Sequence, residues 1–240
     1  MNSSLSAKPI QTSIYRADIP LEDFLWQHLE GQLQEKTIIA ITSKIISVSE
    51  NRLVQKSQIS KAELIQQEAD VLICETIYGV SLTIKDGILI PSAGIDESNS
   101  EDGAYILYPR DSFASARQIW EFLRNKSGIK NLGIIITDSH THPLRRGVTG
   151  IALAHWGFKA TRNLVGDSDL FGRKITMTSV NVVDSLAVAA VFVMGEAAEC
   201  QPIALVEATD VVFCDETNPS EIQIPLDQDL YGPLISPTRT

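Results

Sequence analysis

The sequence lacks any apolar run long enough to cross a membrane. Its longest such run, Leu186 to Met194, is about half the ~20 residues that a membrane helix requires. Residues 1–13 also lack the basic start and apolar core of a secretory signal. We therefore expect a cytoplasmic protein without a membrane partner.

Cysteine and positive charge are also scarce. The three cysteines cannot all pair and none lies in a C-x-x-C motif, which indicates reduced thiols in a reducing compartment. The 20 Lys and Arg residues against 30 Asp and Glu residues give a net charge of −10. Because neutralising phosphates requires clustered Lys and Arg, this balance argues against a nucleic-acid partner.

Several common site motifs are absent as well. The sequence contains no G-x-x-x-x-G-K-[ST], no G-x-G-x-x-G and no G-x-S-x-G. A bound nucleotide is therefore not held by a P-loop or a dinucleotide fingerprint, and the usual serine-hydrolase signature is missing.

The composition present is that of a globular protein. The 240 residues are 44% apolar and 21% charged, which is enough for a substantial core. Four of the ten prolines lie between Pro219 and Pro237. We expect one domain over residues 1–217 and an extended, Pro-rich tail over residues 218–240.

Apolar periodicity and turn residues predict mixed helices and strands. Ser60 and Glu63 form a capping-box pattern, Ser112 is a candidate cap, and Gly128 ends the helix that follows Ser112. Lys85-Asp86-Gly87 predicts a hairpin turn. The predicted helices are Leu21–Leu33, Ser60–Ala69, Ser112–Lys126, Ile151–Ala160 and Ser185–Met194. The predicted strands are Thr37–Thr42, Ile45–Val48, Val71–Glu75, Val80–Ile84, Ile88–Pro91, Ile134–Thr137, Ile175–Val183 and Ile203–Glu207. Without sustained βαβ alternation, this order favours an α+β fold with mixed, largely antiparallel sheets and flanking helices.

The stretch 133–150, GIIITDSHTHPLRRGVTG, concentrates the chemistry. The sequence predicts a buried strand that ends at Thr137, followed by a polar loop. One interpretation is a D-x-H-x-H metal phosphoesterase built on Asp138, His140 and His142, but only His28 and His155 remain as further histidines. A phosphate-transfer site fits better. Asp96 and Asp138 offer hard oxygen ligands for Mg²⁺ or Mn²⁺. The guanidiniums of Arg145 and Arg146 either clamp phosphate oxygens or pair with carboxylates elsewhere.

Several ordered motifs are similar to those of the coenzyme F420-0:γ-glutamyl ligases. They are ITSKIIS (41–47), AGIDESN (93–99), ITDS followed by P.RRG (136–147), DLFGR (169–173), VMGEA (193–197) and PIALVE (202–207). The resemblance spans about Thr37 to Glu207 and is strongest to a branch assigned to folate metabolism as γ-glutamate ligases.

The resemblance implies a GTP-dependent, or alternatively ATP-dependent, ligase that joins L-glutamate to a small-molecule carboxylate through an acyl phosphate. The acceptor would be an F420-0-, folate- or pterin-like molecule. The implied ligands of Mg²⁺ or Mn²⁺ are Asp96, Asp138, Ser139 and Glu196, a hard-oxygen set. The implied nucleotide-binding residues are Thr42, Ser43, Lys44, Asn99, Met194, Gly195 and Ala197, within a segment that continues to Gln201. The family fold further implies an intertwined homodimer.

The chain departs from the family pattern beside the metal. It has Ser139-His140-Thr141-His142-Pro143-Leu144 where the family often has Thr-Phe-Gly-Arg-Pro-Trp, and Val48 replaces a lysine near the nucleotide. Ser139 keeps the hydroxyl of the family's threonine. His140 and His142 either contact the acceptor substrate or supply an additional metal ligand. Together with Arg145 and Arg146 they form the predicted catalytic loop. The alternatives are a non-catalytic nucleotide-binding dimer of the same fold and the metal-dependent phosphoesterase.

Overall fold

The computed structural model describes residues 4–100 and 102–235. They divide into two compact units. The first unit contains residues 4–43 and 111–222, and the second contains residues 44–100, 102–110 and 223–235. Among these residues no helix combines the length and the apolar character needed to span a bilayer.

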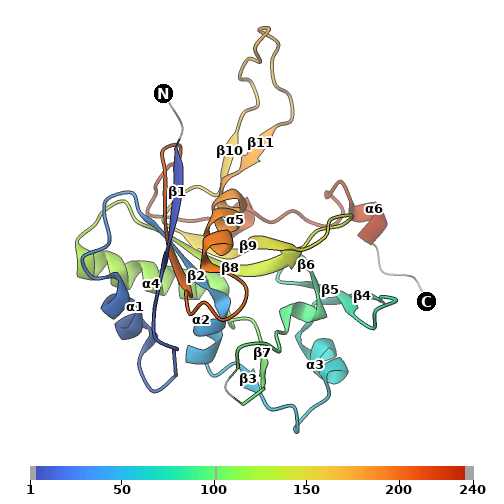
Figure 1. The fold of residues 1–240 in the computed structure, drawn as a ribbon. Coiled ribbons are helices and arrows are strands. Elements are labelled where there is room, and N and C mark those ends of the chain that lie inside the picture. Colours follow the sequence, from blue (N-terminus) through green and yellow to red (C-terminus); the bar gives the residue numbers. More distant parts are fainter. Residues whose placement is uncertain (1–3, 101, 236–240) are drawn as a thin grey trace. The chain divides into compact units, whose positions relative to one another are not determined.

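The first unit is built on a five-stranded sheet in the order β1-β12-β2-β8-β9 (Figure 1). Only β2 and β8 run parallel, and the other neighbours are antiparallel. The predicted α+β class with largely antiparallel sheets is therefore confirmed. The strands are β1 (Leu5–Ile10), β2 (Ile38–Thr42), β8 (Gly133–Thr141), β9 (Val148–Trp156) and β12 (Ile203–Ala208).

Helices cover both faces of this sheet. On one face α5 (Val182–Met194) packs Leu186 and Ala187 against Ala40 and Ile135. On the other, α4 (Ser112–Ser127) contacts β8 and β9, and α1 (Leu21–Leu29) contacts α4. Because strand side chains alternate between faces, a strand covered on both sides is apolar throughout.

A long arm leaves the first unit between β9 and α5. Its root is the antiparallel pair β10 (Thr161–Asn163) and β11 (Ser179–Asn181), and Figure 1 shows residues 164–178 extending away from the sheet. The arm is internally hydrogen-bonded, because a carboxylate oxygen of Asp169 accepts from the amides of Phe171 (2.8 Å) and Arg173 (2.9 Å).

The second unit contains two small sheets. One has the order β4 (Val71–Glu75), β5 (Ser81–Lys85), β6 (Ile88–Pro91), and the other pairs β3 (Leu53–Val54) with β7 (Tyr105–Ile106). Helices α2 (Ser43–Ser49), α3 (Lys61–Glu68) and α6 (Gly232–Ile235) belong to this part of the chain, while the short turn Pro219–Glu221 belongs to the first unit. The core of the second unit is formed by Leu64, Ile65, Ile95, Tyr105 and Leu107.

Local signals predicted three features correctly. The Ser60–Glu63 capping box starts α3. Asp86 and Gly87 both adopt positive φ between β5 and β6, as the hairpin turn requires. Gly128 ends α4 with a φ of 73°. The cap of α4 differs from the prediction, because Asp111 rather than Ser112 accepts the amide of Ala114, at 2.9 Å.

Three predicted segments have another structure. Ile45–Val48 lies in helix α2 rather than a strand, because a run of four apolar residues carries no decisive period. Ile151–Ala160 lies largely in strand β9 rather than a helix. Within Ile175–Val183 only Ser179–Asn181 is strand. Val182 and Val183 belong to α5, because the Asn181 side chain accepts the amide of Asp184 and starts the helix there.

Candidate functional site

One edge of the five-stranded sheet gathers three predicted site segments of the first unit. Thr42 lies opposite Thr137 in the parallel pair β2–β8, so the carboxyl ends of both strands meet there. Strand β8 then continues through Asp138 and Ser139. The Thr42 amide donates to the Pro202 carbonyl at 3.0 Å, which brings the end of the α5–β12 loop to the same edge. The sheet thus joins segments that are far apart in the sequence.

Asp138 and Ser139 are strand residues, which corrects the prediction of a loop after Thr137. Consecutive strand side chains point to opposite faces, so these two residues diverge. Ser139 pairs with Gly150, and a Cβ on Gly150 would lie 2.4 Å from the Ala187 carbonyl oxygen. Ser139 therefore faces helix α5, whereas Asp138 and His140 face the other side.

The predicted residues Met194, Gly195, Glu196 and Ala197 lie where α5 ends and the α5–β12 loop begins. Met194 is the last residue of α5, and its side chain is buried in the core cluster, so it packs rather than faces solvent. Gly195 ends the helix with a φ of 83°, and Glu196 is exposed beyond it. Only the part of this segment after Met194 is open to a ligand.

Two further residues shape this loop: Glu199, within the predicted segment that continues to Gln201, and Gln11, which no sequence pattern singled out. A carboxylate oxygen of Glu199 accepts the Ala197 amide at 2.8 Å. The side-chain amide of Gln11 donates to the carbonyls of Glu199 (3.0 Å) and Cys200 (3.2 Å). Because Gln11 comes from the far N-terminal segment, only the tertiary structure identifies it.

In the second unit, a residue predicted to bind the nucleotide contacts a residue predicted to bind the metal. Lys44 forms an ion pair with Asp96 at 2.6 Å, and Ser98 donates its amide (2.7 Å) and hydroxyl (2.8 Å) to the same carboxylate. Partial burial raises the pKa of the Asp96 carboxyl, but Lys44 and Ser98 outweigh it and hold the pKa below its usual value. Asp96 is thus a carboxylate at neutral pH, and Asn99 follows in the same loop at a φ of 57°.

A strained turn precedes Asp96. Ser92, Ala93 and Gly94 all have positive φ (54°, 53° and 70°), and the Ala93 amide donates to the Thr83 hydroxyl at 2.8 Å. A left-handed backbone costs an ordinary L-residue roughly 1–2 kcal/mol. Such strain persists only where surrounding structure enforces it, often beside functional groups.

The histidines do not gather into one site. His140 and His142 lie close, with ring centroids 5.0 Å apart, and His142 Nε2 is 2.7 Å from the Thr149 hydroxyl. His28 bonds to the Phe24 carbonyl within α1, and His155 is fully buried on β9. Across residues 4–100 and 102–235, no three His, Cys, Asp or Glu side chains are grouped so as to hold a metal ion.

Arg145 and Arg146 follow His142 in the exposed turn between β8 and β9. In the described part of the first unit, neither guanidinium forms an ion pair with a carboxylate. The alternative in which the arginines pair with carboxylates elsewhere is therefore not seen among the described residues of this unit.

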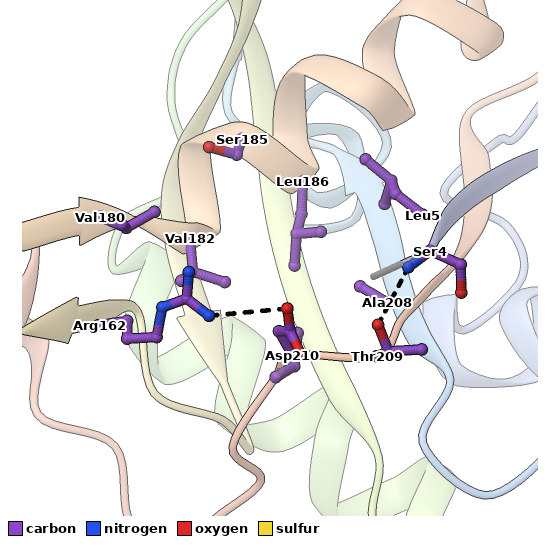
Figure 2. A pocket seen from close by; sticks show the side chains of 11 residues that line it. Ser4, Leu5, Arg162, Val180, Val182, Ser185, Leu186, Ala208, Thr209 and Asp210 are labelled. Carbon is purple, nitrogen blue, oxygen red and sulfur yellow. Dashed lines mark hydrogen bonds and ion pairs between the residues drawn. The ribbon is translucent and has the colours of Figure 1, made fainter. Parts of the chain in front are cut away.

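A separate cavity of about 230 Å³ lies at the root of the arm (Figure 2). Apolar side chains such as Leu5, Val182 and Leu186 form its walls, and an Arg162–Asp210 ion pair (3.6 Å) lies at its rim. None of the predicted site residues lines this cavity.

Comparisons with known proteins match the motif series. The family model described as F420-0:Gamma-glutamyl ligase matches residues 9–208. The coenzyme F420:L-glutamate ligase of Methanopyrus kandleri is 31% identical over 192 residues, which cover 73% of this chain and 76% of the relative. That of Methanocaldococcus jannaschii is 32% identical over 200 residues, 81% of this chain and 76% of the relative. That of Methanococcus maripaludis strain C7 is 30% identical over 231 residues, 87% of this chain and 92% of the relative. The chain therefore belongs to the F420-0:γ-glutamyl ligase family.

Proposed function

We propose that this protein joins L-glutamate to a carboxylate of an F420-0-, folate- or pterin-like acceptor, with GTP or ATP and Mg²⁺ or Mn²⁺. Family membership supports the ligase class. The observation that carries the proposal is the convergence of Thr42, Asp138 and the α5–β12 loop at one sheet edge. Loops and strand ends on a rigid sheet are suited to holding reacting groups.

The proposed chemistry has two steps. An oxygen of the acceptor carboxylate attacks the γ-phosphorus of the nucleotide, and the nucleoside diphosphate leaves. The amine of L-glutamate then attacks the acyl carbon, inorganic phosphate leaves with the acyl-phosphate bond electrons, and the nitrogen loses a proton. Both steps concentrate negative charge on phosphate oxygens, which a cation must offset.

Asp96, Asp138 and Glu196 are the proposed holders of the metal. Ser139, the fourth predicted ligand, points toward α5 from the opposite face of β8, so its hydroxyl is not counted in this set. Three carboxylates match the hard-oxygen preference of Mg²⁺ and Mn²⁺, and the lowered pKa of Asp96 supplies an ionised donor. When bound, the metal would neutralise phosphate charge and polarise the transferred phosphoryl group. The residues proposed to face the nucleotide are Thr42, Ser43, Lys44, Asn99, Gly195 and Ala197, with the backbone of Met194.

The test is a mass-spectrometric screen of candidate carboxylates with GTP or ATP, L-glutamate and Mn²⁺. A product heavier by one glutamyl unit is expected from the wild type. Asp138→Asn removes a proposed metal ligand and should abolish that product, whereas Asp23→Asn, exposed on α1, should keep it. Retained ligation in Asp138→Asn would sink the site assignment.

Calorimetry and a phosphate-ester hydrolysis assay, run beside the screen, separate the alternatives. Calorimetric binding of GTP with Mn²⁺ but no glutamyl product would indicate a non-catalytic nucleotide-binding protein. Hydrolysis of phosphate esters without glutamate would indicate a phosphoesterase.

A homodimer is part of the proposal. The arm exposes Leu170 (99%) and Phe171 (83%), and the outer side of α5 exposes Phe192 (86%) and Val188 (39%). An almost wholly apolar helix such as α5 is normally covered on all sides, and a second copy would cover it. Light scattering in solution should give a mass of about twice the 26.3 kDa chain.

A further inference from the structure

The turn between β8 and β9 is strained and fully exposed. The Arg145 amide donates to the His142 carbonyl at 3.2 Å, and Pro143 and Leu144 lie between them. Leu144 has a φ of 59° at the position where this type of turn prefers glycine. Its side chain is 102% exposed, so packing does not offset the strain. Backbone strain of this kind is concentrated at functional sites, which makes the turn a candidate for one.

The charged residues that flank this turn in the sequence are all basic. No Asp or Glu occurs between Asp138 and Asp167, in a chain with 30 acidic residues. Arg145 and Arg146 therefore have no acidic neighbour in sequence, and no carboxylate of the described first unit pairs with them. Four other arginines of that unit do have a carboxylate partner: Arg117, Arg124, Arg162 and Arg173. The turn thus presents two adjacent guanidiniums that are available to an anion from outside.

The position of the turn favours a ligand other than the transferred phosphoryl group. Strand β8 continues through Thr141, three residues beyond Asp138, which places the Cα atoms of these residues about 10 Å apart at ~3.3 Å per residue. The two arginines lie beyond Thr141, in the turn that closes the hairpin. They are therefore suited to a group that approaches the proposed metal site from that end.

We infer that Arg145 and Arg146 bind the two carboxylates of the incoming L-glutamate. This inference rests on the proposed function, in which L-glutamate is the amine donor. Glutamate carries an α- and a γ-carboxylate, and planar guanidiniums bind carboxylates in a two-pronged geometry. Binding through both carboxylates leaves the amine free to attack the acyl carbon.

His142 is a positioning residue for this pair. Its Nε2 lies 2.7 Å from the Thr149 hydroxyl on the opposite strand, across the base of the turn. That contact ties the two strands together where the turn begins. Replacing His142 by Asn, which can still hydrogen-bond, should change the KM for L-glutamate less than removing either arginine does.

The experiment uses Arg145→Gln, Arg146→Gln and the double variant, with Arg117→Gln as the control because Arg117 is exposed on α4. Each single change should raise the KM for L-glutamate about tenfold, a typical effect of losing one charge-assisted hydrogen bond. The KM for the nucleotide and for the acceptor should stay unchanged. L-Glutamine lacks the γ-carboxylate, so the wild type should prefer L-glutamate strongly and the double variant should largely lose that preference.

Equilibrium binding of L-glutamate, measured by calorimetry, gives a readout independent of ligation. Binding to the wild type with loss in the double variant supports the inference even if no acceptor is ligated, in which case only the proposed function fails. Ligation with an unchanged KM for L-glutamate in the double variant overturns this inference and leaves the proposed function standing. A raised KM for the nucleotide or the acceptor instead overturns it too, because the arginines would then hold another substrate.

Discussion

His155 should make this protein lose stability in mild acid. The side chain is fully buried on β9, and its ring packs edge-on against Phe113 and Phe158. Among the described residues, neither ring nitrogen has a hydrogen-bond partner. Burial lowers the pKa of His155 from 6.5 to about 4, opposed by the Glu221 carboxylate and assisted by Lys159. The folded protein therefore keeps a neutral imidazole where the unfolded chain takes up a proton.

The sign and size of the effect follow from proton linkage. Between pH 6.5 and pH 4 the unfolded state binds the extra proton, so the free energy of unfolding falls as the pH falls. With a pKa of about 4 in the folded state and 6.5 in the unfolded state, the loss from pH 7.5 to pH 5 is about 2 kcal/mol. Below pH 4 this group contributes no further change.

The assay is urea unfolding at pH 7.5 and pH 5 for the wild type and His155→Leu. Leucine removes the titrating ring without breaking any hydrogen bond found among the described residues. The wild type should lose about 2 kcal/mol more than the variant between the two pH values. Equal losses would refute the reasoning, because the acid sensitivity would then arise from other groups.

Two further predictions concern the second unit. Gly94→Ala should lower the free energy of unfolding by about 1–3 kcal/mol more than Gly103→Ala, because a Cβ on Gly94 would lie 2.2 Å from the Tyr108 ring whereas none lies within 4 Å of Gly103. Both glycines have positive φ, so the difference measured by urea unfolding isolates the clash. Ser60→Ala should cost about 1 kcal/mol through loss of the capping box with Glu63, and an unchanged midpoint of thermal unfolding would argue against that cap.

Local sequence signals determined several elements outright. The capping box at Ser60, the Asp86-Gly87 turn and the stop at Gly128 each depend on neighbouring residues alone. The ordered motifs likewise predicted the family, because each motif and its spacing can be read without knowing the fold.

Only the tertiary structure decided what lies beside what. Strand β9 has an apolar run without alternation, because α4 and α5 cover both its faces, so its period did not distinguish a strand from a helix. The contact of Gln11 with Glu199 and Cys200, and the pairing of Thr42 beside Thr137, join residues distant in sequence. Such long-range contacts leave no local pattern in the chain. The sequence thus determined the chemistry available, and the packing of the first unit decided which groups meet at the sheet edge.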